Sequence, residues 1–148
     1  MRYFLDAEYN GFGGELISLA LVPEDKALAP FYAALDCDEP TAWVAEHVMP
    51  VLQVPAVHHD VLADGFAEYL IDDEDPHLVA DWPEDIVHAA RLLVTGPGRM
   101  KPIRSMRFEL VDPEIVGPVP SEIPHNAQSD AEALRAAVLG YEERMSHF

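Results

Sequence analysis

The sequence predicts an α/β fold in which a mixed sheet carries helices on its faces. Two observations favour this class. Three short runs rich in aliphatic and aromatic residues, separated by turn-forming residues, fill the first part of the 148-residue chain. After them, segments with apolar residues at helical spacing alternate with short apolar strands. An antiparallel meander followed by helix-alternating strands gives a mixed sheet.

The first three predicted strands lie at residues 2–8, 16–22 and 30–35. Asn10-Gly11-Phe12-Gly13-Gly14 provides the first turn, and Pro23-Glu24-Asp25-Lys26 provides the second. Strands joined by such short turns are most simply antiparallel neighbours. We therefore expect a three-stranded antiparallel meander.

Apolar periodicity and capping residues predict four helices, at residues 41–48, 60–71, 86–94 and from a cap at residue 129 to about 145. Thr41 is a candidate N-cap of the first helix. Ser129 and Glu132 have capping-box spacing at the start of the last helix, although Asp130 can also serve as its cap.

Two further strands are expected between the helices, at residues 77–80 and 106–111. Four prolines within residues 112–124 predict a loop before the last helix. In sheets of this kind the functional crevice usually lies at the carboxyl ends of the strands.

The charge of the chain restricts its partners. It has 27 acidic and nine basic residues, a net charge of −18. Such a surface repels long polyanions, which argues against a protein that coats duplex DNA. It still permits an enzyme that takes a short strand end together with its own cations.

The length predicts one domain over residues 1–148, large enough for a core, and an apolar content of 49% is typical of a globular chain. One cysteine, Cys37, excludes an internal disulfide. The first residues turn acidic too soon for a signal peptide, and no apolar run is long enough to span a membrane. We therefore expect a cytoplasmic protein without membrane contact.

Two carboxylates one residue apart, Asp6 and Glu8, end the first predicted strand. Alternate side chains of a strand share a face, so these two lie about 6.6 Å apart along it. At that range each disfavours the ionisation of the other, unless the pair is solvated or a cation lies between them. Near the other end of the chain, His125 precedes Asp130 across a loop-to-helix junction. Either segment alone is compatible with a structural role.

Together these segments resemble one family. Phe4-Leu5-Asp6-Ala7-Glu8-Tyr9, an acid at the head of a middle helix, and His125-Asn126-Ala127 followed by Asp130-Ala131 resemble the DEDD-type 3′–5′ exonucleases with a histidine general base. The resemblance runs from residue 3 to about residue 140 and looks closest to a small bacterial exoribonuclease branch. It implies a ribonuclease H-like fold: a three-stranded antiparallel meander plus parallel strands, flanked by helices. Asp85 fits the spacing of the middle acid, and Asp81 remains an alternative.

The resemblance also implies the site. Two Mg²⁺ or Mn²⁺ ions would be held by carboxylates, with Asp6 bridging both. Glu8 and Asp130 would complete the first cation site, and Asp85 would hold the second. His125 would act as the general base that takes the proton of the attacking water.

Several other residues are candidates for substrate contact. Tyr9 and Phe12, just past the carboxylates, can stack on a terminal base or serve in core or surface packing. His58-His59 looks like a metal pair, but no carboxylate pattern frames it, and we interpret it as a loop. A basic segment can contact phosphates or merely balance nearby acids; its members are Arg99, Lys101, Arg104 and Arg107.

The leading hypothesis is therefore a metal-dependent 3′–5′ exoribonuclease that binds the 3′ end of short or structured RNA. A DNA-directed 3′–5′ exonuclease would use the same residues. A non-catalytic acidic interaction domain on the same fold is the alternative from another class. The family resemblance also points to a homodimer.

Overall fold

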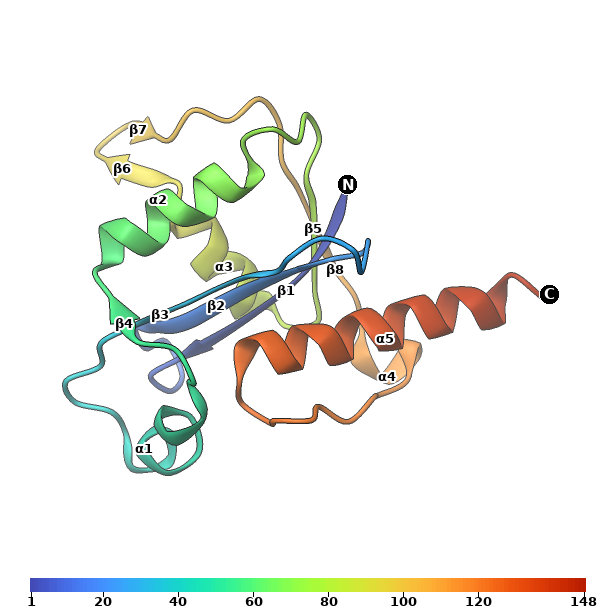
Figure 1. Cartoon of the computed structure of the whole chain (residues 1–148), viewed down its shortest axis with the longest axis horizontal. Coiled ribbons are helices and arrows are strands. Elements are labelled where there is room, and N and C mark those ends of the chain that lie inside the picture. The colour runs from blue at the N-terminus through green and yellow to red at the C-terminus, as the bar shows by residue number, and fades with distance from the viewer.

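A six-stranded mixed sheet with the strand order β4-β3-β2-β1-β5-β8 is the centre of the molecule in the computed structural model, which describes all of residues 1–148 (Figure 1). The strands are β1 (Arg2–Tyr9), β2 (Leu16–Pro23), β3 (Phe31–Leu35), β4 (Ala56–Val57), β5 (His77–Ala80) and β8 (Arg107–Leu110). β2 pairs antiparallel with both β1 and β3, which confirms the predicted meander. β5 pairs in parallel with β1, and β8 with β5.

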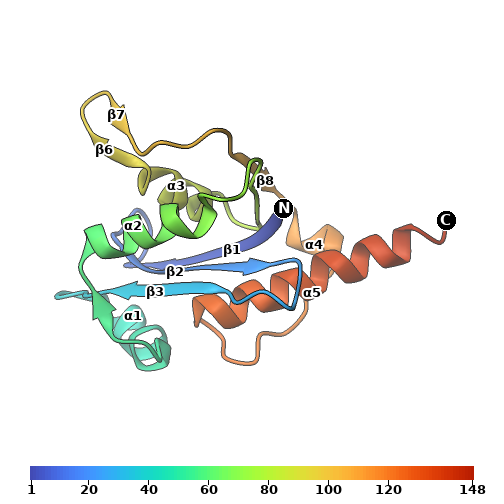
Figure 2. The same ribbon diagram turned by 45° about the horizontal axis from the view of Figure 1, so that its top comes forward.

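Helices cover both faces of this sheet (Figures 1 and 2). They are α1 (Ala42–His47), α2 (His59–Leu70), α3 (Pro83–Arg91), α4 (Pro113–Val116) and α5 (Ala127–Met145). α2 and α3 lie on one face, and α4 and α5 lie on the other. A 3₁₀ turn (Met49–Val51) follows α1, and a small hairpin of β6 (Val94–Gly96) and β7 (Arg99–Met100) follows α3. No helix combines the length and apolar character that crossing a membrane requires.

The side chains of β1 alternate between two hydrophobic cores. Tyr3, Leu5 and Ala7 belong to the cluster that includes α2 and α3 residues. Phe4 belongs to the cluster formed with α5. Because side chains of a strand alternate, Asp6 and Glu8 continue the Phe4 series and lie on the α5 side of the sheet. The core thus presents both carboxylates to the start of the last helix.

The N-cap prediction for the last helix is wrong. Asn126 is the N-cap, and its side chain accepts a hydrogen bond from the backbone N–H of Ser129 at 3.0 Å. Ser129 lies inside the helix, and its hydroxyl accepts from the backbone N–H of Ile123 at 2.8 Å. The Ser129 hydroxyl is therefore engaged by the preceding loop, and neither it nor Asp130 caps the helix.

Two segments predicted as loops contain helical structure. Within residues 112–124, Asp112 caps the short helix α4, whose first residue is Pro113. Proline is tolerated there because the first N–H of a helix needs no partner within the helix. His58 caps α2 and His59 is its first residue, so this pair is not a loop. The two-residue strand β4 was not predicted, because so short an element has no sequence period.

Candidate metal centre

Four elements bring acidic side chains to one place at the carboxyl edge of the sheet. β1 carries Asp6 and Glu8, Asp81 directly follows β5, and Asp85 is in the first turn of α3. Asp130 is in the first turn of α5. β1 and β5 are parallel neighbours, so their carboxyl ends lie at the same edge. α3 and α5 both pack on β1, with their N-termini towards that edge.

The acidic residues form two groups with metal-ligand spacing. In the first group, Glu8, His125 and Asp130 each offer one ligand atom, and these atoms lie within 4.8 Å of one another. In the second group, Asp6, Asp81 and Asp85 do the same. The structure thus brings together all five residues proposed for catalysis. It places Asp81 beside Asp85, so both candidates for the middle acid lie next to Asp6.

Asp6 lies at the centre of this cluster of acidic side chains. Its Oδ2 atom is buried and has no hydrogen-bond partner. The other buried side-chain oxygen without a partner is Oγ of Ser18, which lies on β2 opposite Glu8. Burial raises the pKa of Asp6 well above its ordinary value, and the charges of Asp85 and Glu8 raise it further. An acceptor of this kind needs a proton or a cation.

The pKa values of three neighbouring acids are also raised. Burial, followed by the charge of Asp130, raises the pKa of Glu8 to about 9. Burial and the charge of Asp81 raise the pKa of Asp85 to about 8, with the backbone N–H of Ala7 opposing the shift. The pKa of Asp81 is also raised, mainly by burial. The cluster therefore resists full ionisation unless positive charge enters it.

His125 is held in an unusual backbone conformation. Its φ is +72°, in the left-handed region that costs a non-glycine residue about 1 kcal/mol. Its backbone N–H donates to Oδ2 of Asp130 at 3.2 Å. The imidazole meets the ring of Trp43 edge-on, with centroids 4.8 Å apart, and Trp43 stacks on His47 at 4.5 Å. Backbone strain of this kind is common at functional sites.

Two hollows flank the carboxylates. The larger, about 430 Å³, is lined by Asp6, Glu8 and Asp85 and by aromatic side chains; we call it the aromatic hollow. Its aromatic lining consists of Tyr9, Phe12, Trp43 and Trp82. The smaller hollow, about 220 Å³, lies between the carboxylates and the α4–α5 side, and Asp6, Asp81 and Asp130 line it.

Sequence reasoning placed Tyr9 and Phe12 at this site but missed the two tryptophans. Phe12 is fully exposed, and Trp43 and Trp82 remain about half exposed (51% and 52%). One signal was available for Trp43. It shares a helix face with His47, four residues on, whereas Val44 and Val48 are buried. Trp82 directly follows Asp81, a position for which the sequence offers no comparable signal.

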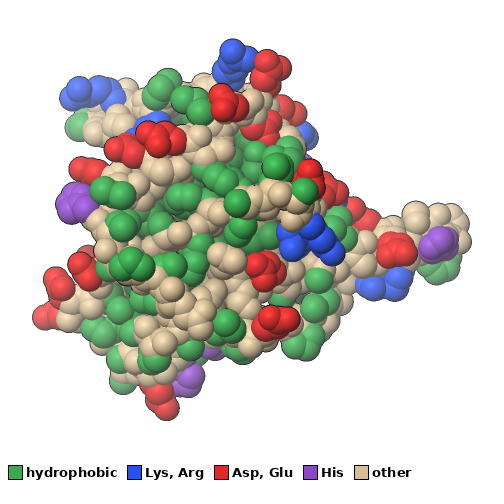
Figure 3. All heavy atoms as spheres, in the orientation of Figure 1, with side chains coloured by type: hydrophobic (Ala, Val, Ile, Leu, Met, Phe, Trp, Pro, Cys, Tyr) green, Lys and Arg blue, Asp and Glu red, His purple; other side chains and the backbone are tan.

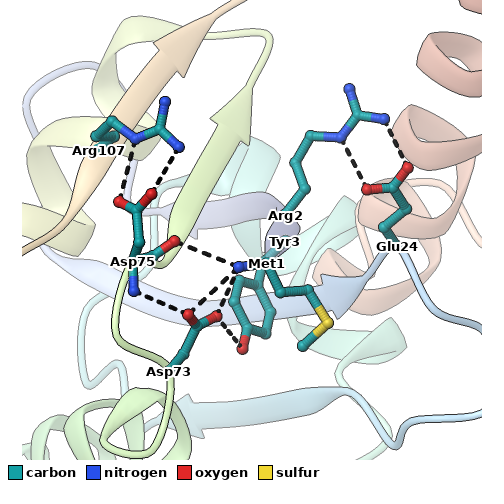
Figure 4. A network of polar contacts seen from close by, with 7 residues as sticks. All are labelled: Met1, Arg2, Tyr3, Glu24, Asp73, Asp75 and Arg107. Atoms are coloured by element: carbon teal, nitrogen blue, oxygen red, sulfur yellow. Dashed lines mark hydrogen bonds and ion pairs between the residues drawn. The ribbon is translucent and has the colours of Figure 1, made fainter.

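The basic segment does not line either hollow. Lys101 pairs with Asp64 of α2. Arg104 pairs with Glu74 at 3.1 Å, and Arg107 pairs with Asp75 at 3.0 Å (Figure 4). On the face seen in Figure 3, several other basic side chains also lie beside acidic ones.

Three of the four basic residues therefore balance nearby acids, which was the alternative left open by the sequence. Arg99, on β7, has no ion pair or hydrogen bond, but it too lies outside both hollows. Contact between Arg99, Lys101 or Arg104 and a substrate stays a prediction.

No model of a known protein family matches this chain, and no curated protein matches it either. What is established is the class of molecule: an α/β protein with a mixed six-stranded sheet and a clustered carboxylate centre at one edge.

Proposed function

We propose that this protein is a metal-dependent 3′–5′ exoribonuclease of the DEDD type, with His125 as general base. The observation that carries the proposal is the unpartnered, buried Oδ2 of Asp6 within a cluster of five carboxylates. Acids so arranged are costly for a fold unless cations bind between them. The mixed sheet, with its antiparallel meander and added parallel strands, is compatible with a ribonuclease H-like fold.

The donor set suits Mg²⁺ or Mn²⁺. Both ions prefer carboxylate and water oxygens, and the centre consists of carboxylates with a single imidazole beside them. Glu8 and Asp130 would hold one cation and Asp85 the other, with Asp6 between them and Asp81 as a further ligand. Two bound cations supply positive charge to the attacking and leaving oxygens of a phosphodiester.

His125 would take a proton from the attacking water. An imidazole can accept a proton at neutral pH, and this one lies within ligand distance of Glu8 and Asp130. The hydrogen bond from its backbone to Asp130 and the edge contact with Trp43 fix the ring next to the first acidic group. This arrangement orients the base before a substrate arrives.

The aromatic hollow would bind the terminal nucleotide. Phe12, Trp43 and Trp82 present exposed ring surface beside the carboxylates. Stacking of one base on such a ring is worth about 1–3 kcal/mol and does not depend strongly on base identity. The strand end would therefore be held largely by stacking. The net negative charge of the chain disfavours binding of a long phosphate backbone along its surface.

The decisive experiment is hydrolysis of a single-stranded RNA oligomer labelled at its 5′ end. The wild type, Asp6→Asn and the control Asp38→Asn would be compared with Mg²⁺, with Mn²⁺ and with chelator; Asp38 is an exposed loop acid. We expect a ladder that shortens from the 3′ end, needs cation and is lost only in Asp6→Asn.

A matched DNA oligomer in the same assay decides between ribonuclease and deoxyribonuclease activity. If neither strand is cut with either cation, and no cation raises the melting temperature, the proposal is wrong. The chain would then be the acidic interaction domain considered above.

A further inference from the structure

A third hollow, of about 480 Å³, lies beside the Gly13–Gly14 turn, on the α2–α3 side of the sheet. Leu16, Leu35 and Leu92 contribute apolar lining, and imidazole and guanidinium groups contribute the polar part. We call it the histidine hollow; its polar lining is Glu15, Asp36, His58, His59, His88 and Arg91. Its volume is in the range of pockets that hold small ligands.

Arg91 is one of the few free cations of the chain. Six of the nine lysine and arginine side chains are engaged in ion pairs or in hydrogen bonds to backbone carbonyls. Arg91 makes no such contact, although the chain carries 27 acids. A guanidinium left unpaired in so acidic a protein, at the wall of a hollow, is suited to bind a phosphate.

The imidazoles add hydrogen-bond donors. Nδ1 of His58 accepts from the backbone N–H of Asp60 at 3.2 Å, so a neutral ring carries its proton on Nε2. That N–H is free to donate to an anion. His88 is 7% exposed, and burial together with the charge of Arg91 lowers its pKa. His88 can therefore act as a neutral donor, and His58 adds its Nε2–H.

The histidine hollow adjoins the candidate metal centre. The ring of His88 stacks on Tyr9 with centroids 4.9 Å apart, and Tyr9 lines the aromatic hollow. The stacked pair therefore joins a residue that lines one hollow to a residue that lines the other. α3 carries Asp85 in its first turn and Arg91 as its last residue, which places them about 9 Å apart along the helix axis. The backbone N–H of Gly13 donates to Glu84 at 3.3 Å and ties the intervening turn to α3.

We infer that the histidine hollow is a second nucleotide-binding site, which takes a nucleotide further along the strand whose 3′ end lies at the carboxylates. The inference rests on the proposed function. Arg91 and His58 would bind the phosphate. Glu15 and Asp36, which would repel a bare phosphate, can accept hydrogen bonds from the hydroxyls of a ribose. The mixed lining therefore favours a nucleotide of RNA over an inorganic anion.

The test compares cleavage of RNA oligomers of two and of five nucleotides by the wild type, Arg91→Ala and Lys26→Ala. Lys26 is equally unpaired but lies in the β2–β3 turn, outside every hollow described here. For Arg91→Ala we expect KM for the five-nucleotide strand to rise about tenfold at unchanged kcat. The slope of log affinity against log salt should also fall by about 0.7, the value for one lost phosphate contact. Lys26→Ala should keep the wild-type ratio between the two oligomers.

Two results would overturn the inference, and they are distinguishable. If the dinucleotide is cleaved but Arg91→Ala and Lys26→Ala show the same length dependence as the wild type, the second site does not exist and the nuclease remains. If the wild type cleaves neither oligomer, the proposed function fails and the second site fails with it. A five-nucleotide strand with deoxyribose upstream of the scissile bond should lose affinity, and unchanged affinity would exclude recognition of a ribose by Glu15 and Asp36.

Discussion

The backbone N–H of His125 donates a hydrogen bond to Oδ2 of Asp130 at 3.2 Å, so the proposed base is attached to the first turn of the helix that carries a proposed metal ligand. His125 also has a left-handed backbone conformation, with a φ of +72°. The two residues therefore act as one structural unit, and changes at the two positions are expected to be coupled.

The first prediction concerns this strain. His125→Gly should raise the free energy of unfolding by up to about 1 kcal/mol, because glycine adopts a positive φ without steric cost. The same change should lower kcat by a factor of about 10²–10⁴, the usual contribution of a general base. Urea denaturation and RNA hydrolysis measure the two effects, with His147→Gly as a control. A variant that is destabilised and fully active would contradict both assignments.

The second prediction concerns Asp6. Asp6→Asn removes a carboxylate whose ionised form the fold disfavours, so the cation-free protein should become more stable at pH 8. Denaturation in the presence of chelator measures this gain. The same variant should lose the stabilisation by Mg²⁺ that we expect for the wild type. Equal stability of the two proteins in chelator would show that Asp6 is not a disfavoured buried charge.

The third prediction is a pH dependence. The folded-state pKa values of Glu8 and Asp85, about 9 and about 8, lie above their unfolded values near 4. The folded protein therefore binds more protons than the unfolded chain between these limits. Without cations, the stability that these two groups contribute should be fully present below about pH 4 and should be lost as the pH rises towards 9.

Urea denaturation across this pH range, with chelator and with Mg²⁺, measures that loss. Mg²⁺ should flatten the curve because it stabilises the ionised form. Glu8→Gln should remove part of the slope, whereas general repulsion among the surface acids would leave the slope of this variant equal to that of the wild type.

The fourth prediction concerns the aromatic hollow. Trp43→Ala and Trp82→Ala should each raise KM by between about fivefold and a hundredfold, equivalent to the loss of one stacked base. Phenylalanine at either position should restore most of the affinity, because it keeps a stacking surface. Val61→Ala is the control, since Val61 is an exposed apolar residue on α2. A KM that does not change in either tryptophan variant would place the terminal base elsewhere.

Much of the site could be predicted because its signals are local. Asp6 and Glu8 share a face by strand alternation alone, and Asp130 is fixed by the start of a periodic helix. The sequence could not decide whether Asp81 or Asp85 is the middle acid, because Asp81 follows the strand and Asp85 begins the next helix. The structure gives the reason: the chain turns tightly there, and both side chains reach Asp6.

What the sequence could not provide depends on tertiary contacts. Ser129 has the spacing of a cap, but Asn126 takes that role because the loop before α5 engages the serine hydroxyl. The sequence could not decide whether the basic segment contacts phosphates or balances nearby acids. Its acidic partners lie on α2 and in the loop after α2, and only the fold brings them together. The histidine hollow combines β2, β3, α2 and α3, which no window of sequence brings together.

The carboxylate centre joins β1, the first strand, to α5, the last helix. A ribosome makes β1 early and α5 late. A chain that still lacks α5 and the loop before it therefore has Asp6 and Glu8 but neither Asp130 nor His125. Any activity of this centre would begin only when the final helix docks on β1. For the proposed nuclease, a nascent chain that still lacks α5 would therefore be unable to hydrolyse RNA.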